Sequence, residues 1–306
     1  MSVDMPYIEA ELARMDAGSA PPSYLRHLHW GLFDADDLDR DDDSPARYVT
    51  AAEAMTDRVV SAAAITDGMP LLDVGCGFGG TLSHIRRHHP SCRLTGLNID
   101  PRQLHWARRL ADADVGPGSH AQIAAGPGTG TGAGAAVAAV AVGSQTGWVA
   151  GDGCRLPVRS ASVDRVLAVE CVFHFPSRKT FFAEAARVLR PGGMLALSDF
   201  VLAPGAMARV AENAVAFDVG GWYGRSTRPI TASGYRKLAA ANGFEVAVDD
   251  DVTARTLPTY PALRRIYREA GMPEATATVD GVEALARAGG WEYHVLAFRL
   301  LANGRG

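Results

Sequence analysis

The sequence predicts an α/β fold in which a mostly parallel sheet is covered by helices on both faces. Short apolar segments alternate with helical segments from residue 71 to residue 252, and this alternation is typical of a parallel sheet. A glycine-rich turn, GCGFGG (75–80), follows the first apolar segment, at a position where open sheets bind ligands. A last apolar segment, WEYHVLAFRLL (291–301), also predicts a strand.

Each element follows from local patterning. Ser44 is a suitable N-cap for a helix, and Pro101 suits the first turn of another. The sequence RPGG (190–193) ends a helix before a strand that starts at Met194. The predicted helices cover residues 44–65, 79–89, 101–111, 177–189, 254–270 and 282–287. The predicted strands cover residues 71–74, 93–98, 148–150, 165–169, 194–199, 244–252 and 291–301.

Composition narrows the class of protein. The 306 residues are 47% hydrophobic and 21% charged, enough for one sizeable core. The net charge of −4 and the absence of a long basic run disfavour a nucleic-acid partner. The four cysteines form no CxxC pair, so we expect reduced thiols in the cytoplasm and no metal site. The acidic N-terminus does not resemble a signal peptide, and no apolar segment is long enough to span a membrane.

The chain divides into a short N-terminal part and one large domain. Residues 1–43 contain an aromatic stretch and then an acidic run, DADDLDRDDD, which we expect to be a solvated loop. Residues 44–306 form the main domain, with cap elements around 205–230 and 254–289. The segment 116–147 is rich in Gly, Ala, Ser and Thr, and has few bulky side chains to bury. We therefore expect it to be a flexible insertion.

The glycine-rich turn suits either a dinucleotide or S-adenosylmethionine (SAM). The spacing Gly75-x-Gly77-x-x-Gly80 also fits a dinucleotide fingerprint. Asp73, however, lies two residues before Gly75 at the end of the predicted strand. A carboxylate there can receive the ammonium group of SAM, whereas it would repel a pyrophosphate. The local residues therefore favour SAM.

Four motifs occur in order: LDVGCGFGG, GLNID, GDGCRLP and VLRPGGMLALSD. With these motifs, residues 44 to 252 resemble the small-molecule branch of the class I SAM-dependent methyltransferases. The resemblance implies a Rossmann-like domain with seven strands, the last one antiparallel, and a helical cap. It also implies SAM as the cofactor and a small-molecule acceptor.

The same resemblance implies the residues that hold SAM. The first motif would contact the methionine part, Asn98 would contact the ribose in the place of the family's usual acid, and Asp152 would accept from the adenine amino group. The complete predicted cofactor site comprises Asp73, Gly75, Gly77, Gly79, Asn98, Ile99, Gln103, Asp152, Gly153, Cys154 and Glu170.

Two alternatives for the chemistry remain open. In VECVFHFP and LSDF, a resemblance to rebeccamycin-type sugar O-methyltransferases implies His174 as a base and Asp199 near the acceptor hydroxyl, although Phe173 replaces the first histidine of the family pair. A resemblance to sterol and prenyl-diphosphate C-methyltransferases implies that Glu170 stabilises a carbocation and removes a proton.

Aromatic residues on both sides of the domain are candidates for binding the acceptor. Tyr24, His29 and Trp30 would form a lid that excludes water. Trp222, Tyr223 and Arg225 follow the fifth strand, and Arg225 could meet a carboxylate or diphosphate. The sequence thus predicts methylation of a small, partly apolar metabolite of secondary metabolism. Oxygen is the favoured target, carbon the alternative, and a non-catalytic SAM-binding regulator a further one. The oligomeric state stays open, and a homo-oligomer is possible.

Overall fold

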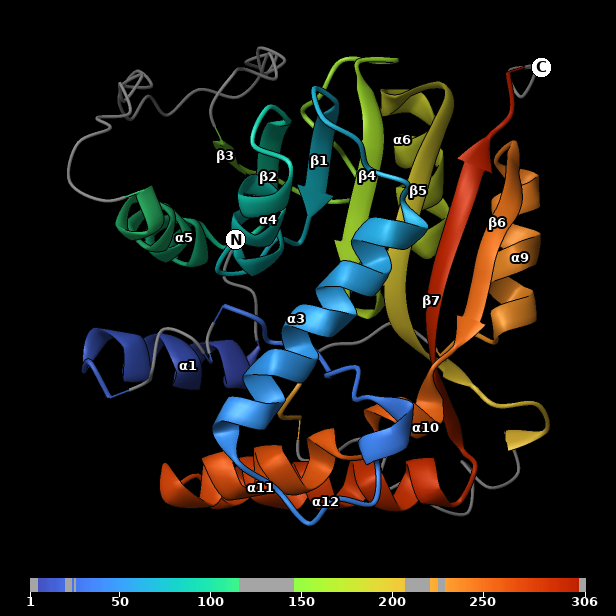
Figure 1. Cartoon of the computed structure of the whole chain (residues 1–306). Helices are drawn as coiled ribbons and strands as arrows, with labels where there is room; N and C mark the ends of the chain where they lie inside the picture. The colour runs from blue at the N-terminus through green and yellow to red at the C-terminus, as the bar shows by residue number, and fades with distance from the viewer. Residues whose placement is uncertain are drawn as a thin grey trace.

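The computed structural model describes residues 5–19, 24, 26–115, 146–206, 221–224 and 229–302 (Figure 1). Its strands are β1 (Pro70–Val74), β2 (Arg93–Asn98), β3 (Gly147–Ala150), β4 (Val163–Val169), β5 (Leu189–Leu202), β6 (Phe244–Asp251) and β7 (Trp291–Leu300). Its helices are α1 (Pro6–Asp16), η1 (Ala35–Asp37), α3 (Pro45–Ala62), α4 (Gly80–His88), α5 (Pro101–Val115), η2 (Val172–His174), α6 (Arg178–Val188), α9 (Ala232–Ala241), α10 (Thr253–Thr256), α11 (Thr259–Glu269) and α12 (Pro273–Arg287).

The seven strands form one sheet in the order β3-β2-β1-β4-β5-β7-β6. The pairs from β3 to β5 are parallel, and β7 runs antiparallel to both of its neighbours. This confirms the predicted seven-stranded, mostly parallel sheet with an antiparallel last strand.

Helices cover both faces of the sheet (Figure 1). One buried cluster joins the sheet to α3, α4 and α5 and to the N-terminal and cap helices. A second cluster on the opposite face joins it to α6 and α9. Neighbouring residues of β1 enter different clusters: Leu71 belongs to the first and Leu72 to the second, because successive strand side chains point to opposite faces.

The chain places a switch point between β1 and β4. From β1 it moves outward through β2 to β3, and it then returns to pair β4 with the other side of β1. The helices that follow β1 and β4 therefore diverge, which leaves a crevice at the carboxyl ends of these strands.

Several predicted boundaries differ from the structure. The single helix predicted over 254–270 is divided into α10 and α11, because Pro258 cannot donate the backbone hydrogen bond that would continue α10. The last helix begins at Pro273, nine residues before the predicted start, with its proline in the first turn. Helix α9 was not predicted.

The predicted insertion and cap lie partly outside the described residues. Of the segment 116–147, the structure describes residues 146 and 147, and Gly147 belongs to β3. Of the cap predicted over 205–230, residues 207–220 and 225–228 are not described. Within the described part of the chain, no helix is both long and apolar enough to cross a membrane.

Candidate active site

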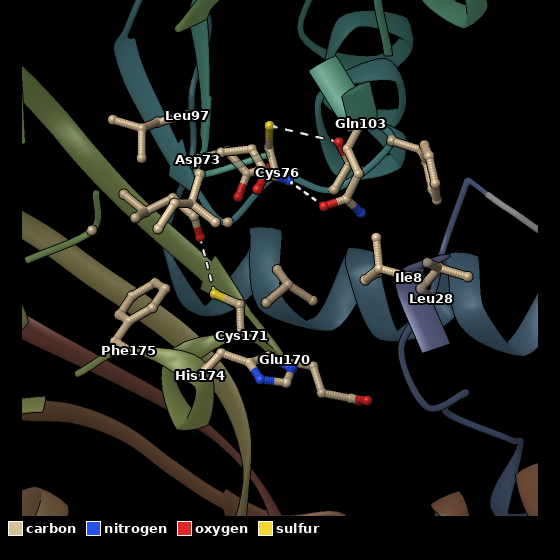
Figure 2. A pocket seen from close by; sticks show the side chains of 18 of the residues that line it. Ile8, Leu28, Asp73, Cys76, Leu97, Gln103, Glu170, Cys171, His174 and Phe175 are labelled. Atoms are coloured by element: carbon tan, nitrogen blue, oxygen red, sulfur yellow. Dashed lines mark hydrogen bonds between the residues drawn. The ribbon is translucent and has the colours of Figure 1, made fainter. Parts of the chain in front are cut away.

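A pocket lies at the switch point, where the carboxyl ends of β1, β2, β3 and β4 meet (Figure 2). Its wall includes eleven residues of the predicted site, which are His29, Asp73, Gly75, Gly77, Asn98, Ile99, Gln103, Asp152, Gly153, Glu170 and His174. The wall also includes Met5, Tyr7, Ile8, Arg26 and Leu28 from the N-terminal segment. We call the described residues between 5 and 33 the N-terminal strap, because they close the pocket on the side away from the sheet.

Asp73 supplies the pocket with a buried carboxylate at the end of β1. Its side chain is 1% exposed, and its Oδ2 atom has no hydrogen-bond partner among the described residues. Burial raises the pKa of Asp73 to about 7. An unpaired buried carboxylate is costly unless a cation or donor meets it. The site therefore fits the ammonium group of SAM.

The three glycines of the first motif have different surroundings. A Cβ atom at Gly75 would lie 2.7 Å from the Cys171 side chain, so this turn packs tightly on the end of β4. A Cβ atom at Gly77, where φ is +52°, would lie 4.0 Å from Gln103 and otherwise meet open space. Gly79 does not line the pocket: a Cβ atom there would lie 2.5 Å from Trp148. Gly75 and Gly77 thus shape the pocket, while Gly79 packs beneath it.

Asn98 and Gln103 form a polar pair at the end of β2. Asn98 Nδ2 donates to Gln103 Oε1 at 3.1 Å, and Asn98 Oδ1 accepts from the Asp100 amide at 3.2 Å. Both side chains are buried and line the pocket. These bonds fix the amide orientation, which leaves the Gln103 amide group facing Gly77.

Asp152 and Gly153 follow β3 at the far end of the pocket. Asp152 Oδ1 accepts from the Cys154 amide at 2.8 Å and closes a tight turn. A Cβ atom at Gly153 would lie 2.9 Å from the Phe175 ring. Cys154 does not line the pocket, because its Sγ atom points to the Ser177 carbonyl at 3.3 Å.

Glu170 lies where β4 ends, across the switch point from Asp73. Its φ of +48° is unusual for a residue with a side chain, and such strain is typical of functional sites. Its Oε2 atom accepts from the Trp30 amide at 2.9 Å and from the Tyr293 hydroxyl at 2.5 Å. Burial raises the pKa of Glu170 to about 8, although both hydrogen bonds act in the opposite direction.

His174 meets a residue that the sequence did not single out. Its Nε2 atom lies 3.0 Å from the Tyr7 hydroxyl, and the two rings stack with centroids 5.7 Å apart. Tyr7 also contacts Tyr223, with ring centroids 5.5 Å apart, and its amide donates to the Trp222 carbonyl at 3.1 Å. The strap and the described part of the cap therefore meet beside His174. The apolar side of the first helix, with Ile8 and Leu12 buried, was the available sequence signal for this contact.

The predicted lid residues take different positions. His29 lines the pocket, whereas Tyr24 and Trp30 lie behind its wall. The Tyr24 hydroxyl donates to Glu11 at 3.4 Å. The Trp30 ring packs edge-on against Phe200 with centroids 4.9 Å apart. The strap as a whole covers the pocket, but of the three residues predicted for the lid only His29 faces it.

The predicted place of Asp199 beside the acceptor is wrong for this structure. Asp199 is fully buried and does not line the pocket. Its side chain points to the face of α6 and α9, where it contacts Arg178 and Tyr235. The neighbouring Ser198 contacts Tyr293 on the opposite face, because the side chains of a strand alternate.

Three other residues were predicted to bind the acceptor. Trp222 and Tyr223 are described but do not line the pocket, and Arg225 lies outside the described residues.

Figure 2 shows Glu170 and His174 on one side of the pocket and Asp73, Cys76 and Gln103 on the other. Ile8 and Leu28 face the same space from the strap. The arrangement brings a buried carboxylate, a glycine turn and two titratable groups around one enclosed space. It can hold a cationic ligand at Asp73 and an acceptor near Glu170 and His174.

Comparison with known proteins finds a methyltransferase domain and related methyltransferases. Residues 72–197 match the model of a methyltransferase domain. The chain is 29% identical over 237 residues to the 27-O-demethylrifamycin SV methyltransferase of Amycolatopsis mediterranei, which covers 77% of this chain and 72% of the relative. It is also 29% identical over 194 residues to a sterol 24-C-methyltransferase of Eremothecium gossypii, which covers 62% of this chain but 43% of that protein. The chain thus spans less than half the length of the sterol enzyme.

Among solved structures, the geranyl diphosphate C-methyltransferase of Streptomyces coelicolor shares the fold. The TM-score is 0.67 at 17% sequence identity, and the match covers 98% of this chain and 100% of the other. That structure contains Mg²⁺, geranyl diphosphate and S-adenosyl-L-homocysteine. The matched domain, the relatives and the seven-stranded fold together support a class I SAM-dependent methyltransferase of small molecules.

Proposed function

We propose that this enzyme methylates a hydroxyl group of a small, partly apolar acceptor, with His174 as the base. The observation that carries the proposal is the contact of 3.0 Å between His174 Nε2 and the Tyr7 hydroxyl in the wall of the pocket that also contains Asp73. Histidine is a common general base in enzymes, because a neutral imidazole nitrogen accepts a proton readily. An acceptor hydroxyl passes its proton to Nε2 directly or through the Tyr7 oxygen.

SAM is held by residues from three strand ends. Asp73 receives the ammonium group, the backbone of Gly75 and Gly77 lies against the methionine part, Asn98 and Gln103 meet the ribose, and Asp152 meets the adenine. When bound, SAM supplies a methyl group that is activated by the adjacent sulfonium. The unpartnered Oδ2 of Asp73 and the fixed amide orientation of Asn98 and Gln103 support this assignment.

The chain's own contribution is to align the acceptor and remove its proton. The strap excludes water from the pocket through Met5, Ile8 and Leu28, and a dry pocket strengthens the polar contacts within it. Alignment of nucleophile and methyl group contributes most of the rate in such displacements. The apolar strap residues support a partly apolar acceptor, and the similarity to the rifamycin enzyme supports oxygen and secondary metabolism.

The test begins with methyl-deuterated SAM and a panel of phenols, glycosides, fatty acids and prenyl diphosphates, with label transfer followed by mass spectrometry. We expect label on oxygen. His174→Ala should then lower kcat at least 100-fold, in line with the contribution of a general base, and leave the Kd for SAM within about twofold.

His105→Ala is the matched control, because His105 is an exposed histidine on α5 outside the pocket wall. Full activity of His174→Ala would remove His174 as the base. SAM binding without turnover, unchanged by combined replacement of Glu170 and His174, would instead indicate a regulator.

Carbon methylation is the second candidate, and the position of Glu170 favours it. The Trp30 amide and the Tyr293 hydroxyl both donate to its Oε2 atom, and the Tyr293 ring packs edge-on against Phe200. A carboxylate in aromatic surroundings can stabilise a carbocation and accept its proton.

Glu170→Gln separates the two candidates. If carbon is the target, the variant should lose at least 100-fold in kcat, because it cannot accept the proton. The wild-type rate should then rise with pH through about 8, as Glu170 ionises. If oxygen is the target, the variant should keep at least a tenth of the rate, and the pH profile should follow His174.

A further inference from the structure

The segment that joins β4 to α6 carries both titratable groups of the proposed acceptor site. It runs from Glu170 through η2 to His174 and reaches α6 at Arg178. Its first end is tied to β5, because the Glu170 amide donates to the Ser198 carbonyl at 3.0 Å. Strand β5 therefore fixes the position of Glu170, the first residue of the segment.

The other end of the segment meets a buried charged cluster. Asp199, in β5, is fully buried, and its Oδ2 atom accepts from the Tyr235 hydroxyl of α9 and from Arg178 Nη2 at 3.4 Å. Arg178 Nε in turn donates to the Tyr235 oxygen at 3.0 Å. Arg178 is 8% exposed and Tyr235 is fully buried. One carboxylate thus joins β5 to the first residue of α6 and to α9.

We propose that Asp199 is a positioning residue, which acts through Arg178 to hold the segment 170–178, and with it His174, against the pocket. The inference rests on the proposed function for the role of His174. Consecutive residues of β5 hold the two ends of the segment, Ser198 through its backbone carbonyl and Asp199 through its side chain. A displacement of about 1 Å at a reacting group can cost roughly 100-fold in rate, so the cluster matters to turnover without contact with the acceptor.

The position of the cluster explains why its charge matters. Removal of one partner of a buried ion pair leaves an uncompensated charge, whereas removal of both charges is often tolerated. Asp199→Asn should remove the carboxylate beside the buried Arg178 guanidinium and shift the start of α6. Combined with Arg178→Met, the change leaves neither charge, but it also removes the contact between β5 and α6, so the start of α6 should remain shifted.

Hydrogen exchange measured by mass spectrometry tests the proposal without a known acceptor. The wild type, Asp199→Asn, and the double variant D199N/R178M are each saturated with S-adenosylhomocysteine. We expect amides of 171–178 to exchange at least fivefold faster in Asp199→Asn and in the double variant, and amides of 70–98 to stay unchanged. Unchanged exchange of 171–178 in Asp199→Asn would overturn the proposal. A return to the wild-type rate in the double variant would also overturn it, because the effect would then come from the buried charge alone.

NMR titration of the His174 ring supplies a second readout, with its signal assigned by its loss in His174→Gln. A positioning role predicts changed ring shifts but the same His174 pKa, within 0.3 units, in Asp199→Asn. A larger pKa change would mean that Asp199 acts directly on His174, and unchanged shifts would mean a purely structural role. If Asp199→Asn does not fold, Tyr235→Phe removes the two hydrogen bonds of the Tyr235 hydroxyl but keeps the ion pair, and it should show the same local exchange at a smaller factor. Because neither readout measures turnover, failure of His174 as the base leaves this test unaffected.

Discussion

At the scale of single residues, the site is defined by carboxylates that are buried even without a ligand to compensate their charge. Asp73 is the clearest case, since one of its oxygens has no partner among the described residues and its pKa rises to about 7. In the unfolded chain the Asp73 carboxyl has a pKa of about 4. The contribution of Asp73 to the free energy of unfolding of the ligand-free enzyme should therefore fall as pH rises from about 4 through 7.

Binding of SAM should reverse this cost, because its ammonium group favours the ionised carboxylate. At pH 6 most of the free enzyme carries a proton on Asp73, so binding should release close to one proton. Between pH 6 and pH 7 the Kd for SAM should fall about fivefold, because Asp73 of the free enzyme loses that proton before SAM binds. Calorimetry in two buffers of different ionisation enthalpy measures the proton release.

Asp73→Asn should weaken SAM binding about 10- to 100-fold at pH 7, the value of a hydrogen bond to a charged group. It should also abolish the proton release. Asp112→Asn is the matched control, since Asp112 is exposed on α5. Wild-type affinity in Asp73→Asn would exclude the ammonium contact.

At the scale of elements, the contact between the strap and α4 closes the pocket. Gly80 begins α4, and a Cβ atom there would lie 1.9 Å from the Arg26 carbonyl oxygen. Arg26 is also tied to α5 by an ion pair with Asp114. The second glycine of the pair 79–80 is thus required by close approach of the strap.

Gly80→Ala should displace the strap, at a cost of about 1–3 kcal/mol for an overpacked contact. We expect faster proteolysis within residues 5–33 and a Kd for SAM raised about tenfold, measured by limited proteolysis and calorimetry. Gly147→Ala serves as the control, because its Cβ atom would lie an ordinary 3.7 Å from Thr95. An unaltered strap in Gly80→Ala would show that the backbone contact is not required for closure.

At the scale of the whole molecule, a buried histidine pair anchors the strap to α3. His27 Nδ1 lies 3.2 Å from His29 Nε2, and Thr56 Oγ1 lies 3.2 Å from each. The Tyr48 hydroxyl lies 2.9 Å from the carbonyl oxygens of both histidines. Burial lowers the pKa of His29 to about 4 and also lowers that of His27.

This pair should make the enzyme sensitive to acid. Below pH 6.5 the unfolded chain binds protons that the folded histidines exclude, so the contribution of this pair to the free energy of unfolding falls as pH decreases from about 6.5 to 4. His29 alone should contribute about 3 kcal/mol to this loss. Urea unfolding at pH 7 and pH 5 measures it. His29→Gln should show a smaller difference between the two pH values, whereas His105→Gln should match the wild type.

The sequence by itself determined the seven strands, the glycine turn, and the carboxylate at the end of β1. It also determined that Glu170 and His174 follow the end of a strand. These features depend on local patterns of a few residues, such as the apolar run before GCGFGG and the N-cap at Ser44, whose side chain accepts from the Arg47 amide. Local patterns of this kind are fixed by backbone and side-chain chemistry alone.

Only the tertiary structure decided which distant residues complete the site. Tyr7 meets His174 across 167 residues of sequence, and no local pattern records that contact. Asp199 faces away from the pocket because strand side chains alternate, so that a shift of one residue in β5 would exchange it with Ser198. Packing of the strap, α6 and α9 on the two faces of the sheet therefore determines which of the predicted residues can touch a ligand.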